Sequence, residues 1–221
     1  MLCGQWDRSG LCGACRQRFA SLQPLRCPQC ALASPGGARC GSCLRTPPPF
    51  HHCTTLADYG FPWDRLIMRF KFQQQPELAG LLADALADVL QQQHGLPAVH
   101  WVLPVPLSPA RLAERGYNQA WELARRIARR RGLRARADAL LRLRDTPHQV
   151  GLGRPARVAN LRDAMWVPPE GQHGIAGCEI ALVDDVMTTG GTAAAAAHAL
   201  LAAGAAGVQV WVLARTPAPG D

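Results

Sequence analysis

The apolar run Ile180 to Val183 is followed by two carboxylates, a short stretch of small polar residues and an alanine-rich segment. An uninterrupted run of this length predicts a strand that is covered on both faces. The segment 192–203 predicts a helix, and Gly204 is a suitable residue to close it. The chain therefore contains one buried strand that runs through a polar loop into a helix.

The rest of the pattern indicates an α/β domain from Thr54 onward. Apolar residues at helical spacing predict helices over 63–72, 76–93 and 121–131. Short apolar stretches predict strands at 56–59, 100–107, 140–143, 164–167 and 208–214, and the second of these breaks into a proline-rich loop. We expect residues 108–120 to continue that loop as far as the next helix.

The length and charge suggest one ordinary domain with a small appendage and a basic surface. The 221 residues carry a net charge of +8, from 23 arginines and a single lysine, Lys71, against 16 acidic residues. Eleven of the arginines fall within residues 111–144. This stretch suits a polyanionic ligand or nucleic acid, or it forms solvated helix faces, and the sequence leaves both interpretations open.

The sequence shows neither the pattern of a signal peptide nor that of a membrane span, and this bears on the expected cellular compartment. Residues 1–10 include Asp7 and Arg8 and have no apolar core, so we expect no signal peptide. No run approaches the roughly 20 apolar residues of a membrane span, so we expect no membrane insertion. The prediction is a soluble, cytoplasmic protein whose thiols stay reduced.

Three Cys-x-x-Cys pairs near the start predict metal binding, because each pair can give two thiolates to a tetrahedral zinc ion. The predicted ligands are Cys27, Cys30, Cys40 and Cys43 for a complete site, and Cys12, Cys15 and Cys3 for an incomplete one. Metal-free reduced cysteines and a disulfide framework are the alternatives. We expect His51, His52 and Cys53 to be packed or solvated, although they offer a replacement ligand.

The loop after the buried strand combines two kinds of binding group. Thr188 to Thr192 can turn backbone N–H groups and hydroxyls toward a phosphate at a helix N-terminus. Asp184 and Asp185 would repel that phosphate and suit neutral hydroxyls or a divalent ion, so the pair and the loop together fit a ribose 5-phosphate. A P-loop ATPase is excluded because Lys71 lies in no Gly-Lys motif, and no Gly-x-Gly-x-x-Gly fingerprint is present.

This stretch resembles the 5-phosphoribosyl-1-pyrophosphate (PRPP) motif of the type I phosphoribosyltransferases, a hydrophobic run followed by Asp-Asp-x-x-x-Thr-Gly-Gly-Thr. The resemblance implies an open, mostly parallel sheet with flanking helices, and Mg²⁺ bound with PRPP. It places Asp184 and Asp185 on the ribose hydroxyls. The implied PRPP-binding residues are Asp184, Asp185, Val186, Met187, Thr188, Thr189, Gly190, Gly191 and Thr192.

Over nearly the whole chain the sequence is similar to the ComF-type competence proteins. The paired cysteines, Phe70-Lys71, Pro104 to Leu107, the Arg-Gly-Tyr-Asn-Gln block at 115–119 and the Asp-Asp loop come in that family's order. The resemblance implies a zinc-ribbon domain at 1–50, a phosphoribosyltransferase-like domain at 54–217, and a role in uptake or processing of transforming DNA. Single-stranded DNA and other DNA-uptake proteins are the implied partners. The incomplete first cysteine set departs from the family pattern.

The proline-rich loop follows a strand, and open parallel sheets bind ligands at that end. The candidates for binding pyrophosphate there are Lys71, Val105, Pro106, Arg111 and Arg115. Tyr117, Asn118 and Gln119 either line a base pocket or cap the next helix, for which Asn118 is a good N-cap. Residues 145–162 are the implied flexible hood, in which His148 is expected to be a contact residue more than a catalytic base.

The implied activity is phosphoribosyl transfer, by displacement at ribose C1 without a protein nucleophile. Two alternatives stay open. One is a non-enzymatic nucleic-acid-binding module that uses PRPP as a regulatory ligand, and the other is a nucleobase-salvage phosphoribosyltransferase, against which the zinc ribbon counts. Nothing in the sequence identifies the acceptor.

Overall fold

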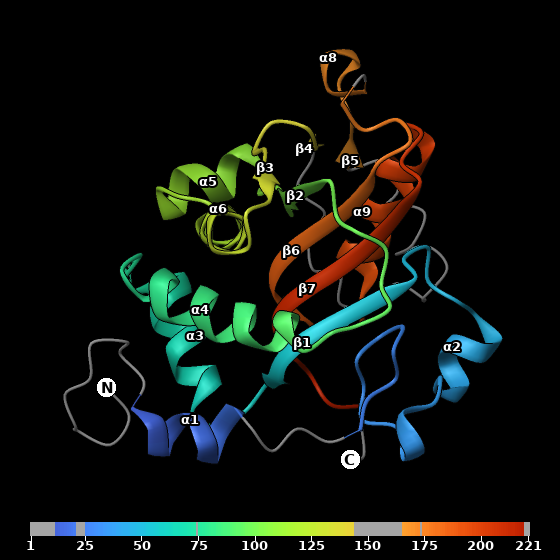
Figure 1. Cartoon of the computed structure of the whole chain (residues 1–221). Coiled ribbons are helices and arrows are strands. Elements are labelled where there is room, and N and C mark those ends of the chain that lie inside the picture. Colours follow the sequence, from blue (N-terminus) through green and yellow to red (C-terminus); the bar gives the residue numbers. More distant parts are fainter. Residues whose placement is uncertain (1–11, 21–24, 74, 144–164, 173, 219–221) are drawn as a thin grey trace, which may run out of the picture.

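A computed structural model describes residues 12–20, 25–73, 75–143, 165–172 and 174–218. Its main sheet has the strand order β1-β7-β6-β2-β3, and every pair in it is parallel. The strands are β1 (His52–Asp58), β2 (Trp101–Pro104), β3 (Arg134–Ala135), β6 (Glu179–Met187) and β7 (Gly207–Arg215). The predicted α/β fold with an open, mostly parallel sheet is therefore confirmed (Figure 1).

The predicted stretches 140–143 and 164–167 form a separate antiparallel pair. They appear as β4 (Leu141–Arg142) and β5 (Met165–Trp166). The strand expected at 56–59 begins earlier, at His52, because its first residues pair with Gln209 and Val210 of β7. This pairing starts in the interval between the two predicted domains.

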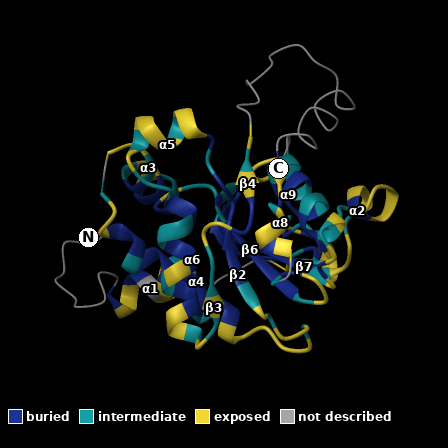
Figure 2. Ribbon diagram, turned by 90° about the horizontal axis from the view of Figure 1, so that it is seen from above, coloured by how far each residue is buried: buried dark blue, intermediate teal, exposed yellow. Residues whose placement is uncertain are grey.

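The central strands are buried on both faces, as their unbroken apolar sequences predict. Leu182 of β6 lies opposite Leu103 of β2 and Val210 of β7, and all three side chains are buried. Parallel strands in such positions are covered by helices on each side. Figure 2 shows the buried residues gathered along β2, β6 and β7.

Helices cover the two faces of the sheet unequally. On one face pack α3 (Trp63–Phe72), α4 (Leu78–Gln91) and α6 (Gln119–Arg131), which bury residues such as Leu82 and Ile127 against the sheet. On the other face lies α9 (Gly191–Ala202), whose alanines and Leu200 pack against Val210. Small side chains let this helix approach the sheet closely, and it opens directly from the loop that follows β6.

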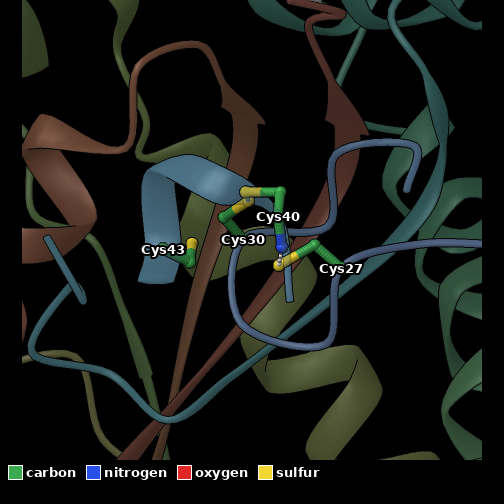
Figure 3. Close-up of side chains that lie close together, drawn as sticks. All are labelled: Cys27, Cys30, Cys40 and Cys43. Atoms are coloured by element: carbon green, nitrogen blue, oxygen red, sulfur yellow. Dashed lines mark hydrogen bonds between the residues drawn. The ribbon is translucent and has the colours of Figure 1, made fainter. Parts of the chain in front are cut away.

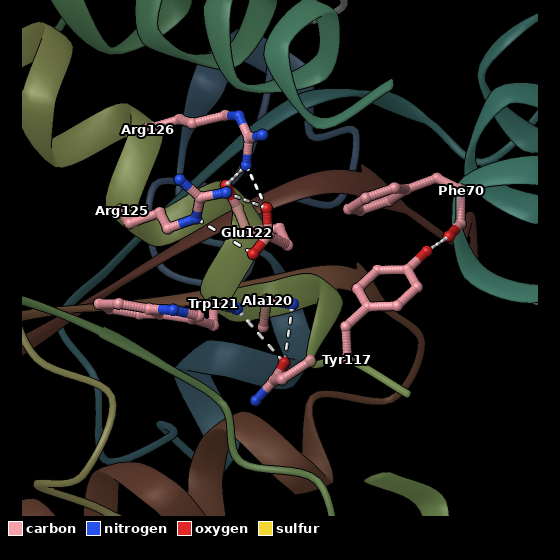
Figure 4. Close-up of polar contacts among 8 residues, drawn as sticks. Phe70, Tyr117, Ala120, Trp121, Glu122, Arg125 and Arg126 are labelled. Atoms are coloured by element: carbon pink, nitrogen blue, oxygen red, sulfur yellow. Dashed lines mark hydrogen bonds and ion pairs between the residues drawn. The ribbon is translucent and has the colours of Figure 1, made fainter. Parts of the chain in front are cut away.

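The prediction that residues 108–120 form a loop is wrong. The segment contains α5 (Pro109–Arg115), and α6 begins at Gln119. Ser108 caps α5 by accepting a hydrogen bond from the Arg111 amide at 3.4 Å, and Gly116 ends it with φ of 76°. Asn118 caps α6 through the amides of Ala120 and Trp121, which Figure 4 draws. Serine before proline is a recognised helix start, so the signal was present in the sequence.

The cysteine-rich segment lies beside β1 (Figure 1). It contains α1 (Gly13–Ala20), the 3-10 turn η1 (Pro35–Gly37) and α2 (Gly41–Arg45), and a short helix α8 (Pro169–Gln172) occurs later in the chain. The Cys53 amide donates to the Pro28 carbonyl at 2.9 Å, and Arg26 pairs with Asp58 at 2.7 Å. The segment thus contacts both ends of β1. Within the described ranges, no helix is long and apolar enough to cross a membrane.

Candidate functional site

A cleft of about 370 Å³ opens where β1, β2, β6 and β7 end. Loops at the carboxyl ends of parallel strands meet at one edge of a sheet, which is where such folds bind ligands. Among the predicted site residues, the cleft is lined by Lys71, Val105, Pro106, Arg111, Arg115, Gln119, Asp184, Asp185, Val186, Thr188 and Thr192. Residues from five separate segments of the chain therefore meet around one space.

The acidic pair forms the floor of this cleft. Asp185 is only 2% exposed, and its Oδ2 lies 2.8 Å from Nζ of Lys71 and 3.4 Å from Nε2 of Gln119. Asp184 is half-buried, and its Oδ1 accepts the Asp185 amide at 2.8 Å. Burial and the neighbouring Asp185 raise the pKa of Asp184 to about 8, although Lys71 opposes this shift. One carboxylate is thus matched by a cation, while the other favours its proton at neutral pH.

The cationic wall of the cleft comes from α5. Arg111 and Arg115 lie four residues apart on this helix, and the Arg115 guanidinium sits 5.1 Å from the centre of the Phe72 ring. Nη1 of Arg115 and Oε1 of Gln119 are buried with no hydrogen-bond partner in the described part of the chain. Because buried polar atoms are nearly always satisfied, these two atoms indicate a place that a polar ligand completes.

The phosphate loop, defined here as Thr188–Thr192, leads from β6 into α9. Gly190 has φ of 81°, a conformation that strongly favours glycine, and the Gly191 amide donates to Oγ1 of Thr189 at 3.4 Å. The loop surrounds a small recess of about 40 Å³ beside Asp184. Its position at the start of a helix of 12 residues suits an anion.

Tyr117 and Asn118 do not line the cleft. The Tyr117 hydroxyl donates to the Phe70 carbonyl (Figure 4), and its ring packs 5.9 Å from that of Phe70. Asn118 caps α6 and donates through Nδ2 to the Val105 carbonyl at 3.1 Å. The helix-cap interpretation of Asn118 is confirmed, and Gln119 alone of these three residues reaches the cleft.

Carboxylates neutralise part of the predicted basic stretch. Glu122 pairs with both Arg125 and Arg126 (Figure 4), and Arg130 pairs with Asp84 at 2.8 Å and with Asp88. Further along the chain, the guanidinium groups of Arg134 and Arg136 lie 5.7 and 5.8 Å from the centre of the Trp101 ring. The basic surface is therefore smaller than the arginine count suggests.

Four cysteines gather as predicted for the complete metal site. The sulfurs of Cys27, Cys30, Cys40 and Cys43 all lie within 4.8 Å of one another (Figure 3). Sγ of Cys30 is 3.6 Å from Sγ of Cys40, and the Cys40 amide donates to Sγ of Cys27 at 3.3 Å. Four thiolates at about 2.3 Å from a tetrahedral zinc ion would be about 3.8 Å apart, so the spacing fits this ion.

The ionisation of these thiols also suits a bound cation. Burial opposes ionisation of Cys27, but the amides of Cys40, Cys30 and Gln29 outweigh it and lower the pKa of Cys27 to about 7. Burial raises the pKa of Cys30 to about 11, and burial together with the neighbouring sulfurs raises the pKa of Cys43. A cation would remove the repulsion that keeps these thiols protonated.

The other predicted ligands lie elsewhere. Cys12, directly before α1, and Cys15, on α1, are buried in the same core cluster as residues of α3 and α4, and the four-cysteine cluster does not include them. Cys3, the hood at 145–162 and His148 lie outside the described residues. His51 pairs with Glu179 at 3.1 Å and Cys53 is buried, which agrees with the packing interpretation of that segment.

Sequence reasoning missed several residues of the site. Met68 and the 55% exposed Phe72 line the cleft from α3, and Tyr59 and Thr216 line it from the ends of β1 and β7. Their proximity depends on the strand order, which no local pattern reveals. Arg215 was missed for the same reason: it is buried and donates to the Met187 and Thr188 carbonyls, directly before and within the phosphate loop.

The parallel sheet, the carboxylate pair and the loop that opens α9 define a phosphoribosyltransferase-like α/β protein. No family model matches the chain. It is 38% identical over 219 residues to the DNA utilization protein YhgH of Escherichia coli O6:H1, covering 96% of this chain and 92% of that protein. It is 33% identical over 213 residues to competence protein F of Haemophilus influenzae, covering 94% and 91%. The chain therefore belongs to the ComF family of competence proteins.

The comparisons also found more distant similarities. Competence protein ComFC of Bacillus subtilis is 28% identical over 214 residues, which cover 93% of this chain and 84% of that protein. Among solved structures, the PRPP amidotransferase of B. subtilis matches with a TM-score of 0.44 and 16% identity, covering 66% of this chain and 30% of that one. Adenine phosphoribosyltransferase of Leishmania tarentolae gives 0.37 and 19%, covering 62% and 56%. Scores this low carry no argument about activity.

Proposed function

We propose that the protein binds PRPP together with Mg²⁺ in the cleft at the end of β6, and that this binding serves the DNA-related role of the ComF family. One observation carries the proposal. A carboxylate pair with one buried and one half-buried member, unsatisfied polar atoms of Arg115 and Gln119, and a phosphate loop all border the same space. PRPP carries neutral hydroxyls between two phosphorylated positions, which matches this order of groups.

Each part of the ligand has an assigned partner in the proposal. Asp184 and Asp185 accept hydrogen bonds from the ribose hydroxyls, and the contact with Lys71 at 2.8 Å holds the Asp185 side chain in place for that purpose. Amides and hydroxyls of the phosphate loop hold the 5-phosphate. Arg111 and Arg115 face the pyrophosphate from α5, where a guanidinium can bind two oxygens at once.

The catalytic form of the proposal is a displacement at ribose C1. The bond from C1 to pyrophosphate breaks with its electron pair leaving on oxygen, while a nucleophile brought by the acceptor forms the new bond. Mg²⁺ supplies charge neutralisation on the departing pyrophosphate when it is bound. The chain's own contribution is to fix the ribose by its carboxylates and to stabilise the leaving group by its arginines.

Calorimetric titration tests the binding proposal. PRPP should bind the full-length protein in the presence of Mg²⁺, and more weakly when Mg²⁺ is withheld. Absence of any binding heat or competition at millimolar PRPP would refute it. Release of pyrophosphate in the presence of purine bases, pyrimidine bases or single-stranded DNA separates a transferase from a protein that only binds PRPP, and it separates a salvage enzyme from one that acts on DNA.

We also propose that the four-cysteine cluster binds one structural zinc ion within a ribbon domain at 1–50, followed by the phosphoribosyltransferase-like domain at 54–217 in a cytoplasmic protein. The sulfur spacing supports this. Elemental analysis of chelator-washed protein should give about one zinc per chain. Cys40→Ser with Cys43→Ser should lose that zinc, whereas Cys12→Ser with Cys15→Ser should retain it. A folded, zinc-free wild type would contradict the assignment.

A second candidate function is binding of single-stranded DNA. It is favoured by the names of the relatives and by Trp101, an aromatic ring with the guanidinium groups of Arg134 and Arg136 at 5.7 and 5.8 Å from its centre. Changing Arg134 and Arg136 to Ala should weaken single-stranded DNA binding in electrophoretic shifts, with a salt slope reduced by about two phosphate contacts. Arg136 also pairs with Asp138 at 3.2 Å, so the control is an ion-paired couple that, within the described part of the chain, has no contact with the Trp101 ring. Arg125 and Arg126, which pair with Glu122, provide this control, and their change to Ala should have a smaller effect. Equal effects of the two pairs would argue against a local DNA site.

A further inference from the structure

Arg215, the last residue of β7, is a buried cation whose partners are backbone carbonyls. It is 5% exposed. Its Nη1 donates to the carbonyls of Met187 at 3.0 Å, of Thr216 at 2.8 Å and of Thr188, and its Nε donates to the carbonyl of Cys30 at 2.9 Å. Burying a charge is costly unless hydrogen bonds satisfy it, so this guanidinium depends on all of these carbonyls remaining in place.

The carbonyls that Arg215 contacts belong to two separate sites. Met187 and Thr188 form the junction of β6 with the phosphate loop, where the backbone must turn for Gly190 to reach φ of 81°. Cys30 is one of the four clustered cysteines. One planar group therefore connects the backbone of the predicted metal site to the backbone of the predicted phosphate site.

The turn that carries Cys27 and Cys30 is held against the sheet at two further points. The Pro28 carbonyl accepts the Cys53 amide at 2.9 Å, and Nε2 of Gln29 donates to the Phe50 carbonyl at 3.2 Å. With its base fixed in this way, the turn has limited freedom near Cys30. Cys30 directly follows these two held residues, so a metal that binds the Cys30 sulfur would fix the remaining part of the turn, which includes the Cys30 carbonyl.

We propose that Arg215 is a positioning residue that couples metal binding at the four cysteines to the geometry of the phosphate loop. The metal-loaded cluster fixes the Cys30 carbonyl, Arg215 aligns on it, and the loop is held in the form that accepts the 5-phosphate. The proposal rests on the proposed binding of zinc and PRPP. Because coupling between two sites is reciprocal, PRPP must raise the affinity for zinc by the factor by which zinc raises the affinity for PRPP.

A thermodynamic cycle on full-length protein tests this reciprocity. The dissociation constant for PRPP with Mg²⁺ is measured with zinc loaded and with zinc removed, and the dissociation constant for zinc is measured by chelator competition with and without PRPP. We expect both ratios to agree at about fivefold or more in the wild type, and to fall to about one in Arg215→Met. Arg130→Met, which removes an arginine from the far side of α6, should keep the wild-type ratio. A wild-type ratio of one overturns the proposal.

Hydrogen exchange provides a readout that needs no PRPP. Removing zinc should accelerate amide exchange in residues 187–192 of the wild type more than in α4. In Arg215→Met and in Arg215→Lys, whose single amine cannot span both groups of carbonyls, these amides should exchange fast with or without zinc. An unchanged loop in zinc-free wild type overturns the proposal, as does acceleration spread evenly over the sheet. If Arg215 variants do not fold, the affinity cycle and the hydrogen-exchange comparison on the wild type still test the coupling. If zinc removal changes exchange in the loop but PRPP does not bind, the proposed PRPP function is rejected and the coupling between the cysteine cluster and the loop is retained.

Discussion

Strand β6 carries buried carboxylates at both of its ends, and their surroundings differ. At its start, Glu179 is 6% exposed, and its Oε1 accepts a hydrogen bond from Nε2 of Gln209 at 3.1 Å. Nε2 of His51 lies 3.1 Å from the same oxygen. Gly207 on the neighbouring strand leaves room for this carboxylate, because a Cβ there would collide with it. At the other end, Asp184 and Asp185 border a cleft in which polar atoms of Arg115 and Gln119 lack partners.

The difference teaches how to tell a structural acid from a binding acid on one strand. Protein side chains provide the hydrogen-bond partners of Glu179, so this carboxylate does not require a ligand. At the cleft end, the raised pKa of Asp184 favours its protonated form, and Asp185 pairs with Lys71. Two further buried atoms, Nη1 of Arg115 and Oε1 of Gln119, have no hydrogen-bond partner among the described residues. Unpartnered buried atoms also occur elsewhere in the described residues, for example in Thr54 and Trp211. Among them, only those of Arg115 and Gln119 border an open cleft, and this combination marks the carboxyl end of the sheet as the place for a ligand.

The strongest test of this contrast changes both cleft acids. Asp184→Asn with Asp185→Asn should weaken PRPP binding by at least about a hundredfold, because each lost charge-assisted hydrogen bond costs about 1.5–3 kcal/mol. The double variant should still fold, with a lower melting temperature because Lys71 loses its ion pair with Asp185. Calorimetry and thermal unfolding measure the two effects. Unchanged PRPP affinity in the folded double variant would contradict the assignment of the carboxylate pair.

The opposite end of the strand should behave in the opposite way. Glu179→Gln keeps one oxygen that can accept from Gln209 and His51, but a neutral amide is a weaker acceptor than a carboxylate, so the free energy of unfolding should fall by about 1–2 kcal/mol. Affinity for PRPP should stay within about twofold. Denaturant titration together with calorimetry checks both statements. A large loss of PRPP affinity here would mean that the two ends are not independent.

A single cation of the cleft sharpens the comparison further. Arg115→Met keeps an unbranched apolar stem, but it removes the guanidinium, and with it the contact to the Phe72 ring and the unsatisfied Nη1. Pyrophosphate and PRPP should each bind about tenfold more weakly, the cost of roughly one hydrogen bond to a charged group. Ribose 5-phosphate, which has no pyrophosphate, should lose much less. Equal losses of affinity for PRPP and for ribose 5-phosphate would contradict the assignment of Arg115 to the pyrophosphate.

The smallest expected effect is a dependence of stability on pH. The folded-state pKa of Asp184 is raised from 3.8 to about 8, so the folded protein keeps a proton that the unfolded chain releases above about pH 4. The stability from this proton is fully present below pH 4 and is lost as pH rises through 8. Asp184→Asn cannot ionise and should be more stable than the wild type by about 1 kcal/mol at pH 9, allowing for solvent at this half-buried group. The free energies of unfolding of the two proteins should converge near pH 4. A difference that stays constant with pH would show that the pH dependence does not come from Asp184.

Much of this arrangement could be predicted where local pattern decides structure. The apolar run before Asp184, the alanines after Thr192 and the amphipathic segment that became α4 (Leu78–Gln91) all carry their own period. The cysteine spacing identified the four residues that cluster. The missed helix α5 carried a local signal too, in Ser108-Pro109 and Gly116, but its proline-rich surroundings favoured a loop.

What could not be predicted depends on which strands are neighbours. Lys71 was expected to face pyrophosphate, and its pairing with Asp185 follows only when α3 packs beside the end of β6. Arg130 was counted in the basic surface, yet it lies against Asp84 and Asp88 because α6 packs on α4. Long side chains reach several ångströms, so their partners are chosen by tertiary packing that no window of sequence contains.

The contact between the cysteine-rich segment and β1 has a consequence for handling the protein. β1 is the outer strand of the sheet, paired on one side with β7. Hydrogen bonding of Cys53 to Pro28 at the start of β1 and the pairing of Asp58 with Arg26 near its end place the segment along the outer edge of the strand. Outer strands with open amides are templates for intermolecular pairing and aggregation. A fragment that begins at residue 54 would expose this edge of β1. We therefore expect the cysteine-rich segment to protect the strand from pairing with other copies of the chain.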